Sequence, residues 1–198
     1  MRNWGLKNLK VDLEKHTATV RFPGLGGSKH DKFGLVTMET LQQMAVVIRL
    51  YILHQPYNEA GDEFLDWDKA TADRMFFICS AQMTMSEALW DTYIIKWPLD
   101  ARVSLGNVGK SSFSFVTEFF LTDVPDKPVF RETAQAVAVN LFTRKSLPLP
   151  DWFQEKYSGK GVLGRSFIIR PIDKPGNTYV QNVKVSRRDS LIPLSVFT

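Results

Sequence analysis

One apolar helix, followed by a series of strands, constrains the fold of this chain most strongly. A helix is predicted from Thr37 to about Gln55, because eleven of the seventeen residues between them are apolar and only Glu39 and Arg49 are charged. Thr37 is a suitable N-cap residue, and Pro56 ends the segment. A helix that is apolar on most sides is surrounded by protein, so we expect it in the core.

Five segments rich in β-branched, aromatic or alternating apolar residues predict strands. They are residues 16–22, 75–85, 93–105, 111–122 and 129–143. The alternation is strongest in residues 93–105, where every odd position is apolar, and Pro98 predicts a bulge or an edge there. Ala134, Ala136 and Ala138 share one face of the last strand and leave room for a helix. The sequence therefore predicts an α+β architecture, with a long central helix wrapped by a curved antiparallel sheet.

The composition is that of an ordinary globular protein and excludes several classes. The chain has 198 residues, of which 44% are hydrophobic and 23% charged, so disorder is not expected. The single cysteine excludes a disulfide framework within one chain, and the three histidines are scattered. We therefore expect no metal and no cofactor. A run of about 18 apolar residues is absent, so no membrane span is expected.

The positive charge of the chain lies at its two ends. Residues 1–30 and 151–198 each carry a net charge of +4, whereas residues 31–150 carry −4. Nucleic-acid binding needs a basic stripe on the folded body, so we expect no nucleic-acid partner. The first ten residues lack the apolar core of a signal peptide. We expect a cytoplasmic protein, and the basic N-terminus leaves import into an organelle open.

Four local sequences are informative in their order and spacing. They are TVRF (19–22), DKFGLVT (31–37), LGNVGKSSFSF (105–115) and SLPLPDWF (146–153). Together they resemble the hotdog-fold thioesterases of the 4-hydroxybenzoyl-CoA and acyl-ACP thioesterase type, over about residues 15–152. Residues 31–37 stand where that family writes D-x-x-G-H-V-N, directly before its central helix. Leu35 and Thr37 replace the histidine and the asparagine of this motif.

The resemblance implies hydrolysis of an acyl-CoA or acyl-ACP thioester, with Asp31 as base or nucleophile. A carboxylate activates water or attacks the carbonyl, and the amides at a helix N-terminus stabilise the oxyanion that forms. The expected donors are the backbone amides of Gly34, Leu35, Val36 and Thr37. Asp31 equally fits a loop carboxylate with a local turn hydrogen bond. Glu39 is the rival base, although the helix dipole alone favours an acidic residue in the first turn.

Further candidates flank this motif or follow a glycine turn. Lys110, Ser111 and Ser112 are candidates to bind the phosphates of CoA or of a phosphopantetheine arm, and a solvated hairpin tip is the alternative. His30, beside the candidate base, forms a weaker acid–base hypothesis. Cys79 is expected to be buried.

Residues 1–152 are expected to form one hotdog domain. Residues 153–198 are expected to form a basic C-terminal extension, either the start of a truncated second hotdog unit, which it resembles, or a tail strand or interface extension. Residues 57–74 are expected to form a solvated loop. Because the resemblance places the site where two units meet, it also implies a homodimer.

Two alternatives to a thioesterase stay open. One is a catalytically inactive hotdog module that binds acyl groups or a protein partner, which the replaced histidine and asparagine favour. The other is a dehydratase acting on 3-hydroxyacyl thioesters, for which only His30 or His54 would be available.

Overall fold

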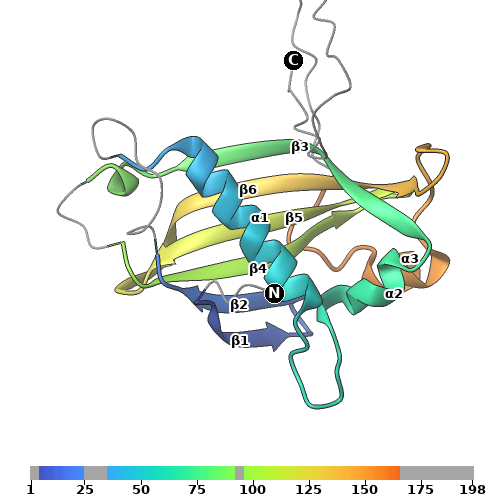
Figure 1. Cartoon of the computed structure of the whole chain (residues 1–198), viewed down its shortest axis with the longest axis horizontal. Coiled ribbons are helices and arrows are strands. Elements are labelled where there is room, and N and C mark those ends of the chain that lie inside the picture. Colours follow the sequence, from blue (N-terminus) through green and yellow to red (C-terminus); the bar gives the residue numbers. More distant parts are fainter. Residues whose placement is uncertain (1–4, 25–34, 92–95, 166–198) are drawn as a thin grey trace, which may run out of the picture. The chain divides into compact units, whose positions relative to one another are not determined.

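The chain folds as an α+β unit, which a computed structural model describes for residues 5–24, 35–91 and 96–165 (Figure 1). Six strands form an antiparallel sheet in the order β1-β2-β4-β5-β6-β3. The strands are β1 (Lys7–Asp12), β2 (Thr17–Phe22), β3 (Arg74–Met85), β4 (Leu99–Val108), β5 (Ser112–Leu121) and β6 (Val124–Asn140). The helix α1 (Met38–His54), of 17 residues, lies across one face of this sheet.

The core lies on the inner face, which we define as the face of the sheet that α1 covers. Leu41, Ala45, Ile48 and Ile52 of α1 are fully buried at helical spacing. The strands present alternate residues to this face, as their pleat requires. The buried inner-face residues include Ala18, Val20, Phe22, Leu99, Ala101, Val103, Leu105, Phe113, Phe115, Phe119, Ala134, Ala136 and Ala138.

One ion pair is buried in this core. Arg49 of α1 donates to the carboxylate of Glu132 on β6 and, at 3.1 Å, to the hydroxyl of Thr117 on β5. All three residues are buried. A buried charge is stable only beside a well-placed partner. The pair therefore joins the middle of α1 to two strands at one fixed position.

The segment after α1 is partly buried, which corrects the expectation of a solvated loop at residues 57–74. It contains the 3-10 helix η1 (Phe64–Asp66) and the short helix α2 (Trp67–Thr71). Phe64 and Trp67 are buried, and the ring of Trp67 lies 5.2 Å from that of Phe76 and 6.4 Å from that of Phe113. The apolar residues here follow no regular period, so the pattern does not indicate their burial.

Two further helices complete the described part. They are η2 (Glu87–Leu89), after β3, and α3 (Asp151–Tyr157), after β6. Phe153 of α3 is fully buried, with its ring 5.3 Å from that of Phe113. Residues 166–198, on which the hypothesis of a second hotdog unit mostly depends, lie outside the described residues. Among the described helices, none is long and apolar enough to cross a membrane.

The helix and the five predicted strands are present, with three local differences. The strand expected over residues 93–105 begins only at Leu99, and Trp97 is exposed rather than part of its apolar face. Strand β1 is not predicted, because its lysines interrupt the apolar alternation. Cys79 is exposed, not buried, because a bulge between Ile78 and Ser80 interrupts the alternation of β3.

Candidate functional site

The N-terminus of α1 is the centre of the predicted site. Thr37 has extended backbone angles, and its hydroxyl accepts a hydrogen bond from the amide of Thr40 at 3.2 Å, as expected of an N-cap residue. The carbonyl of Thr37 accepts from the amide of Leu41 at 3.2 Å. The helical donors that remain in the first turn belong to Met38 and Glu39, whose amides make no hydrogen bond to a described residue.

The predicted donors, from Gly34 to Thr37, directly precede these amides in the chain. Val36 is buried in the core, and Leu35 is half-buried. Thr37 uses its side chain to cap the helix. Asp31 and Gly34, the predicted base and the first predicted donor, lie outside the described residues, as does His30.

Glu39 is exposed on the side of α1 that faces away from the sheet. Its carboxylate accepts a hydrogen bond from the side-chain amide of Gln43, one turn later, at 2.9 Å. Three apolar side chains on this helix, Met38, Val46 and Leu50, are exposed as well. Glu39 is therefore placed to act only on a group that approaches α1 from outside its own sheet.

Lys110 and Ser111 lie in the turn between β4 and β5, and Ser112 is the first residue of β5. The carbonyl of Lys110 accepts from the amide of Leu149 at 2.8 Å, and the hydroxyl of Ser112 accepts from the side chain of Gln135 at 3.1 Å. The side chain of Lys110 is exposed. The turn is thus anchored at its backbone and carries an exposed lysine.

This turn lies at the C-terminal end of α1, not at its N-terminus. Trp67 links the two, because its indole donates to His54 at 3.3 Å and its ring packs on Phe113, directly after the turn. A helix of 17 residues is about 25 Å long. Its N-terminus therefore lies toward the opposite end of the sheet, where β3 ends (Figure 1). Within one chain, the structure does not bring the phosphate-binding candidates and the helix N-terminus together.

Within the described part of the chain, one cluster has the composition of a metal site. Candidate ligand atoms of His54, Glu63 and Asp68 lie within 4.8 Å of one another. However, Nε2 of His54 accepts the hydrogen bond from Trp67, so Nδ1 of the neutral ring carries the proton and offers no lone pair. Glu63 accepts from the backbone amide of Asp68 at 2.9 Å. The arrangement fits a hydrogen-bonded link between α1 and α2 better than a metal centre.

A second polar cluster, which the sequence does not indicate, joins η1 to α3. Asp66 accepts hydrogen bonds from Lys156 at 2.6 Å and from the hydroxyl of Tyr157 at 2.7 Å. Burial opposes ionisation of Asp66, but the two hydrogen bonds outweigh it and lower the pKa of its carboxyl. Burial and the bond to Asp66 raise the pKa of Tyr157. The cluster holds α3 against η1, which itself contacts α1.

Comparison with known proteins identifies the fold. No protein-family model matches the chain, and no curated protein matches its sequence. Several solved structures match about 71% of the chain. One is a 1,4-dihydroxy-2-naphthoyl-CoA thioesterase from Synechocystis, with 16% sequence identity, 94% of that chain covered and a TM-score of 0.52. Another is a DHNA-CoA thioesterase from Staphylococcus aureus, with 14% sequence identity, 88% of that chain covered and a TM-score of 0.52. A third is a structure described as a probable thioesterase from Escherichia coli, with 15% sequence identity, 94% of that chain covered and a TM-score of 0.53.

These similarities define the class of fold. At 14–16% identity and TM-scores of 0.52–0.53, the likeness concerns the fold. The chain therefore has the hotdog fold of these thioesterases, as the local sequence resemblance predicts.

Proposed function

We propose that this protein hydrolyses acyl thioesters, with CoA as the favoured carrier and acyl carrier protein as the other. The observation that carries the proposal is the N-terminus of α1, where amide donors of the first turn follow directly after the Asp31–Thr37 segment on a thioesterase fold. Such donors favour the negative charge that develops on a thioester oxygen. The fold alone does not assign an activity, so the proposal depends on this site.

The chemistry assigns one role to each group. Asp31 deprotonates a water molecule, or attacks the thioester carbonyl itself, and the carbonyl oxygen gains negative charge. Amides at the start of α1 donate to that oxygen: either those of Met38 and Glu39, which make no hydrogen bond to a described residue, or some of those of Gly34 to Thr37. Collapse of the tetrahedral species breaks the carbon–sulfur bond, and the thiolate takes the proton that Asp31 removed from water. If Asp31 attacks the carbonyl itself, the collapse leaves the acyl group on its carboxylate as an anhydride, which a water molecule then hydrolyses. Glu39 is the alternative base, and Lys110, Ser111 and Ser112 are proposed to bind the phosphates of the carrier.

The active form is proposed to be a homodimer that pairs through β3. The two edges of the sheet differ in a way that supports this pairing. Strand β3 has 12 residues, its one charged residue is Arg74 at its start, and Phe77 and Ile78 are exposed. Strand β1, at the other edge, has only 6 residues, two of them lysines. Short, charged edges resist pairing, whereas long apolar edges favour it.

Antiparallel pairing of two β3 strands explains why the candidates lie apart in one chain. A two-fold axis near the middle of β3 places the start of one strand beside the end of the other. The start of β3 lies on the side of the β4–β5 turn, since Phe77 is opposite Val137 and Val137 is opposite Ser112. The Lys110 turn of one copy then lies at the same end of the joint sheet as the N-terminus of α1 in the other copy.

Turnover of acyl-CoAs tests the activity. We expect the wild type to hydrolyse members of a panel of straight-chain and aromatic acyl-CoAs, and Asp31→Asn to reduce kcat by at least about 100-fold, the usual contribution of a general base. Asp123→Asn, a matched change at an exposed turn, should leave kcat unchanged. If Asp31→Asn retains activity and Glu39→Gln does not, the base is Glu39.

The inactive acyl-binding module is the second candidate. Leu35 stands in place of the family's histidine, and the side chain of Thr37 is used for capping, which favours this alternative. Absence of turnover on every acyl-CoA by a purified dimer, with acyl-CoA binding retained, would support it and contradict hydrolysis.

The association through β3 is tested separately. Ile78→Lys introduces a charge at the apolar edge and should convert a dimer to a monomer in sedimentation experiments. Leu13→Lys, at an exposed position next to β1, is the control. A dimer that survives Ile78→Lys unchanged contradicts pairing through β3.

A further inference from the structure

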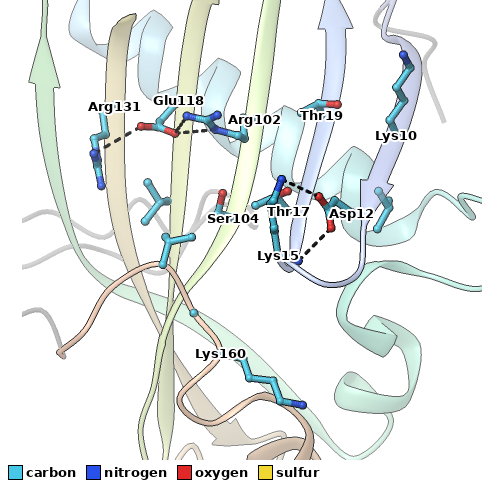
Figure 2. A pocket seen from close by; sticks show the side chains of 14 residues that line it. Lys10, Asp12, Lys15, Thr17, Thr19, Arg102, Ser104, Glu118, Arg131 and Lys160 are labelled. Carbon is cyan, nitrogen blue, oxygen red and sulfur yellow. Dashed lines mark hydrogen bonds and ion pairs between the residues drawn. The ribbon is translucent and has the colours of Figure 1, made fainter. Parts of the chain in front are cut away.

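The outer face of the sheet, which points away from α1, carries a row of charged and polar side chains. The strand register places Lys10 opposite Thr19, Thr19 opposite Arg102, Arg102 opposite Glu118, and Glu118 opposite Arg131. The row therefore crosses β1, β2, β4, β5 and β6 (Figure 2). Neighbouring strands lie about 4.8 Å apart, so the row extends for about 19 Å.

A pocket of about 750 Å³ opens on this row. Thr17 and Ser104 belong to its lining, in the next row along the strands. Lys160, from the chain after α3, lines the margin of the pocket, and its side chain points away from the row (Figure 2). Val162 donates its amide to the carbonyl of Leu105 at 2.9 Å, which fixes this segment against β4. The pocket is thus built by the sheet and by the segment that follows α3.

The lining is strongly positive. Its charged residues are Lys10, Lys15, Arg102, Arg131 and Lys160 against Asp12 and Glu118, a net charge of +3. Glu118 is shared by Arg102, at 2.9 Å, and by Arg131, at 3.6 Å, and Asp12 is paired with Lys15 at 3.5 Å. Lys10 and Lys160 make no ion pair with a described residue. Part of two guanidinium groups therefore stays available for an anion. The two lysines lie at opposite margins of the pocket with their side chains pointing apart (Figure 2), and their flexible stems let the ammonium groups turn toward a ligand.

We propose that this outer-face pocket binds a compact ligand that carries two or more phosphate groups. Phosphate groups carry multiple negative charges, and their oxygens accept many hydrogen bonds. A group of cations and hydroxyl groups supplies both the opposite charge and the donors. A simple carboxylate brings one charge, which leaves most of the pocket's charge unbalanced. The volume is within the range of small-molecule sites. The lining residues include no aromatic ring, so the pocket offers no stacking platform for nucleic-acid bases.

The pocket is separate from the proposed hydrolytic site. Along β2 and β4 the residues next to the pocket residues, such as Ala18 and Val103, point to the opposite face and are buried in the core. Ligand binding at the outer face can therefore be measured without turnover, and the result does not depend on thioesterase activity.

Titration calorimetry with tripolyphosphate tests the proposal on the full chain. We expect saturable one-site binding to the wild type, which weakens as salt is raised because the contacts are ionic. Lys10→Glu/Lys160→Glu should weaken binding at least about tenfold, since it reverses the two cations that lack partners. Lys127→Glu/Lys145→Glu makes the same change in net charge at exposed positions outside the pocket and should retain wild-type affinity.

Competition then identifies the source of the phosphates. If CoA displaces tripolyphosphate and loses affinity in Lys10→Glu/Lys160→Glu, the pocket takes the phosphates of CoA. If ATP displaces tripolyphosphate and CoA does not, the pocket takes a separate phosphorylated ligand. Both results support the proposal. It is overturned if none of the three compounds saturates, if both double variants lose affinity equally, or if a single-stranded oligonucleotide binds more tightly than all three.

Discussion

Arginine–glutamate pairs occur on both faces of the sheet, in different surroundings. On the inner face, the side chains of Arg49 and Glu132 are 6% and 2% exposed. On the outer face, those of Arg102 and Glu118 are 43% and 8% exposed, and Glu118 is shared with a second arginine. The inner pair neutralises itself and fixes α1 in the core. The outer group leaves positive charge at the surface, where it can bind an anion.

Breaking the inner pair should have the largest effect on stability. Arg49→Met leaves Glu132 buried without its partner, which should lower the free energy of unfolding by about 3–5 kcal/mol. Replacing both partners, in Arg49→Met/Glu132→Leu, should restore much of this loss because no unpaired charge remains. Urea unfolding, followed by circular dichroism, measures the free energy of unfolding of both variants. A double variant less stable than Arg49→Met would contradict this account of the inner face.

Enlarging a small inner-face residue should have the next largest effect on stability. Ala136→Leu adds volume where α1 and the sheet are closely packed, and should cost about 1–3 kcal/mol. Thr133→Leu is the matched change on the outer face of the same strand, where the added side chain extends away from the core. Equal losses in the two variants would show that the faces are not packed differently.

Removal of the outer carboxylate should have a smaller effect. Glu118→Gln leaves Arg102 and Arg131 partly exposed to water, so it should cost only about 1–1.5 kcal/mol. The same variant raises the net charge of the outer-face pocket by one and should strengthen tripolyphosphate binding. Weaker binding in Glu118→Gln would mean that Glu118 orders the two arginines more than it competes with the ligand.

The smallest predicted effect is a pH dependence at His16. Burial, followed by the charges of Lys160 and Lys156, lowers the pKa of His16 below its usual 6.5, and Asp12 opposes this. The unfolded chain therefore binds the proton more readily, and stability should fall as the pH falls below about 6.5. Thermal unfolding of wild type and His16→Gln measures the difference. If His16→Gln loses stability with falling pH as steeply as the wild type, another group is responsible.

The sequence predicts the inner face well and the outer face poorly. Helical and alternating periods mark residues such as Ile48 and Val103, which are buried as expected. Such periods do not indicate which polar side chains pair with one another. Arg49 and Glu132, for example, lie 83 residues apart in the sequence. The row from Lys10 to Arg131 depends on the register of five strands, which no local pattern specifies.

The candidate site is predictable only in part, for a similar reason. The cap at Thr37 and the acidic first turn are local features, and the structure confirms both. The distance of Lys110 from the N-terminus of α1 depends on the direction of long strands. A local hairpin sequence carries no information about which end of a helix, or which copy of the chain, lies beside it.

The central claim is that the hydrolytic site is shared between two copies, and mixed dimers test it most directly. Asp31→Asn and Lys110→Glu each impair every site of their own dimer. When the two variants are mixed and allowed to exchange subunits, half of the dimers contain one site with both residues intact. The account predicts that acyl-CoA hydrolysis returns to about one quarter of the wild-type rate. A mixture that remains as inactive as its components, although mixed dimers have formed, would contradict a shared site.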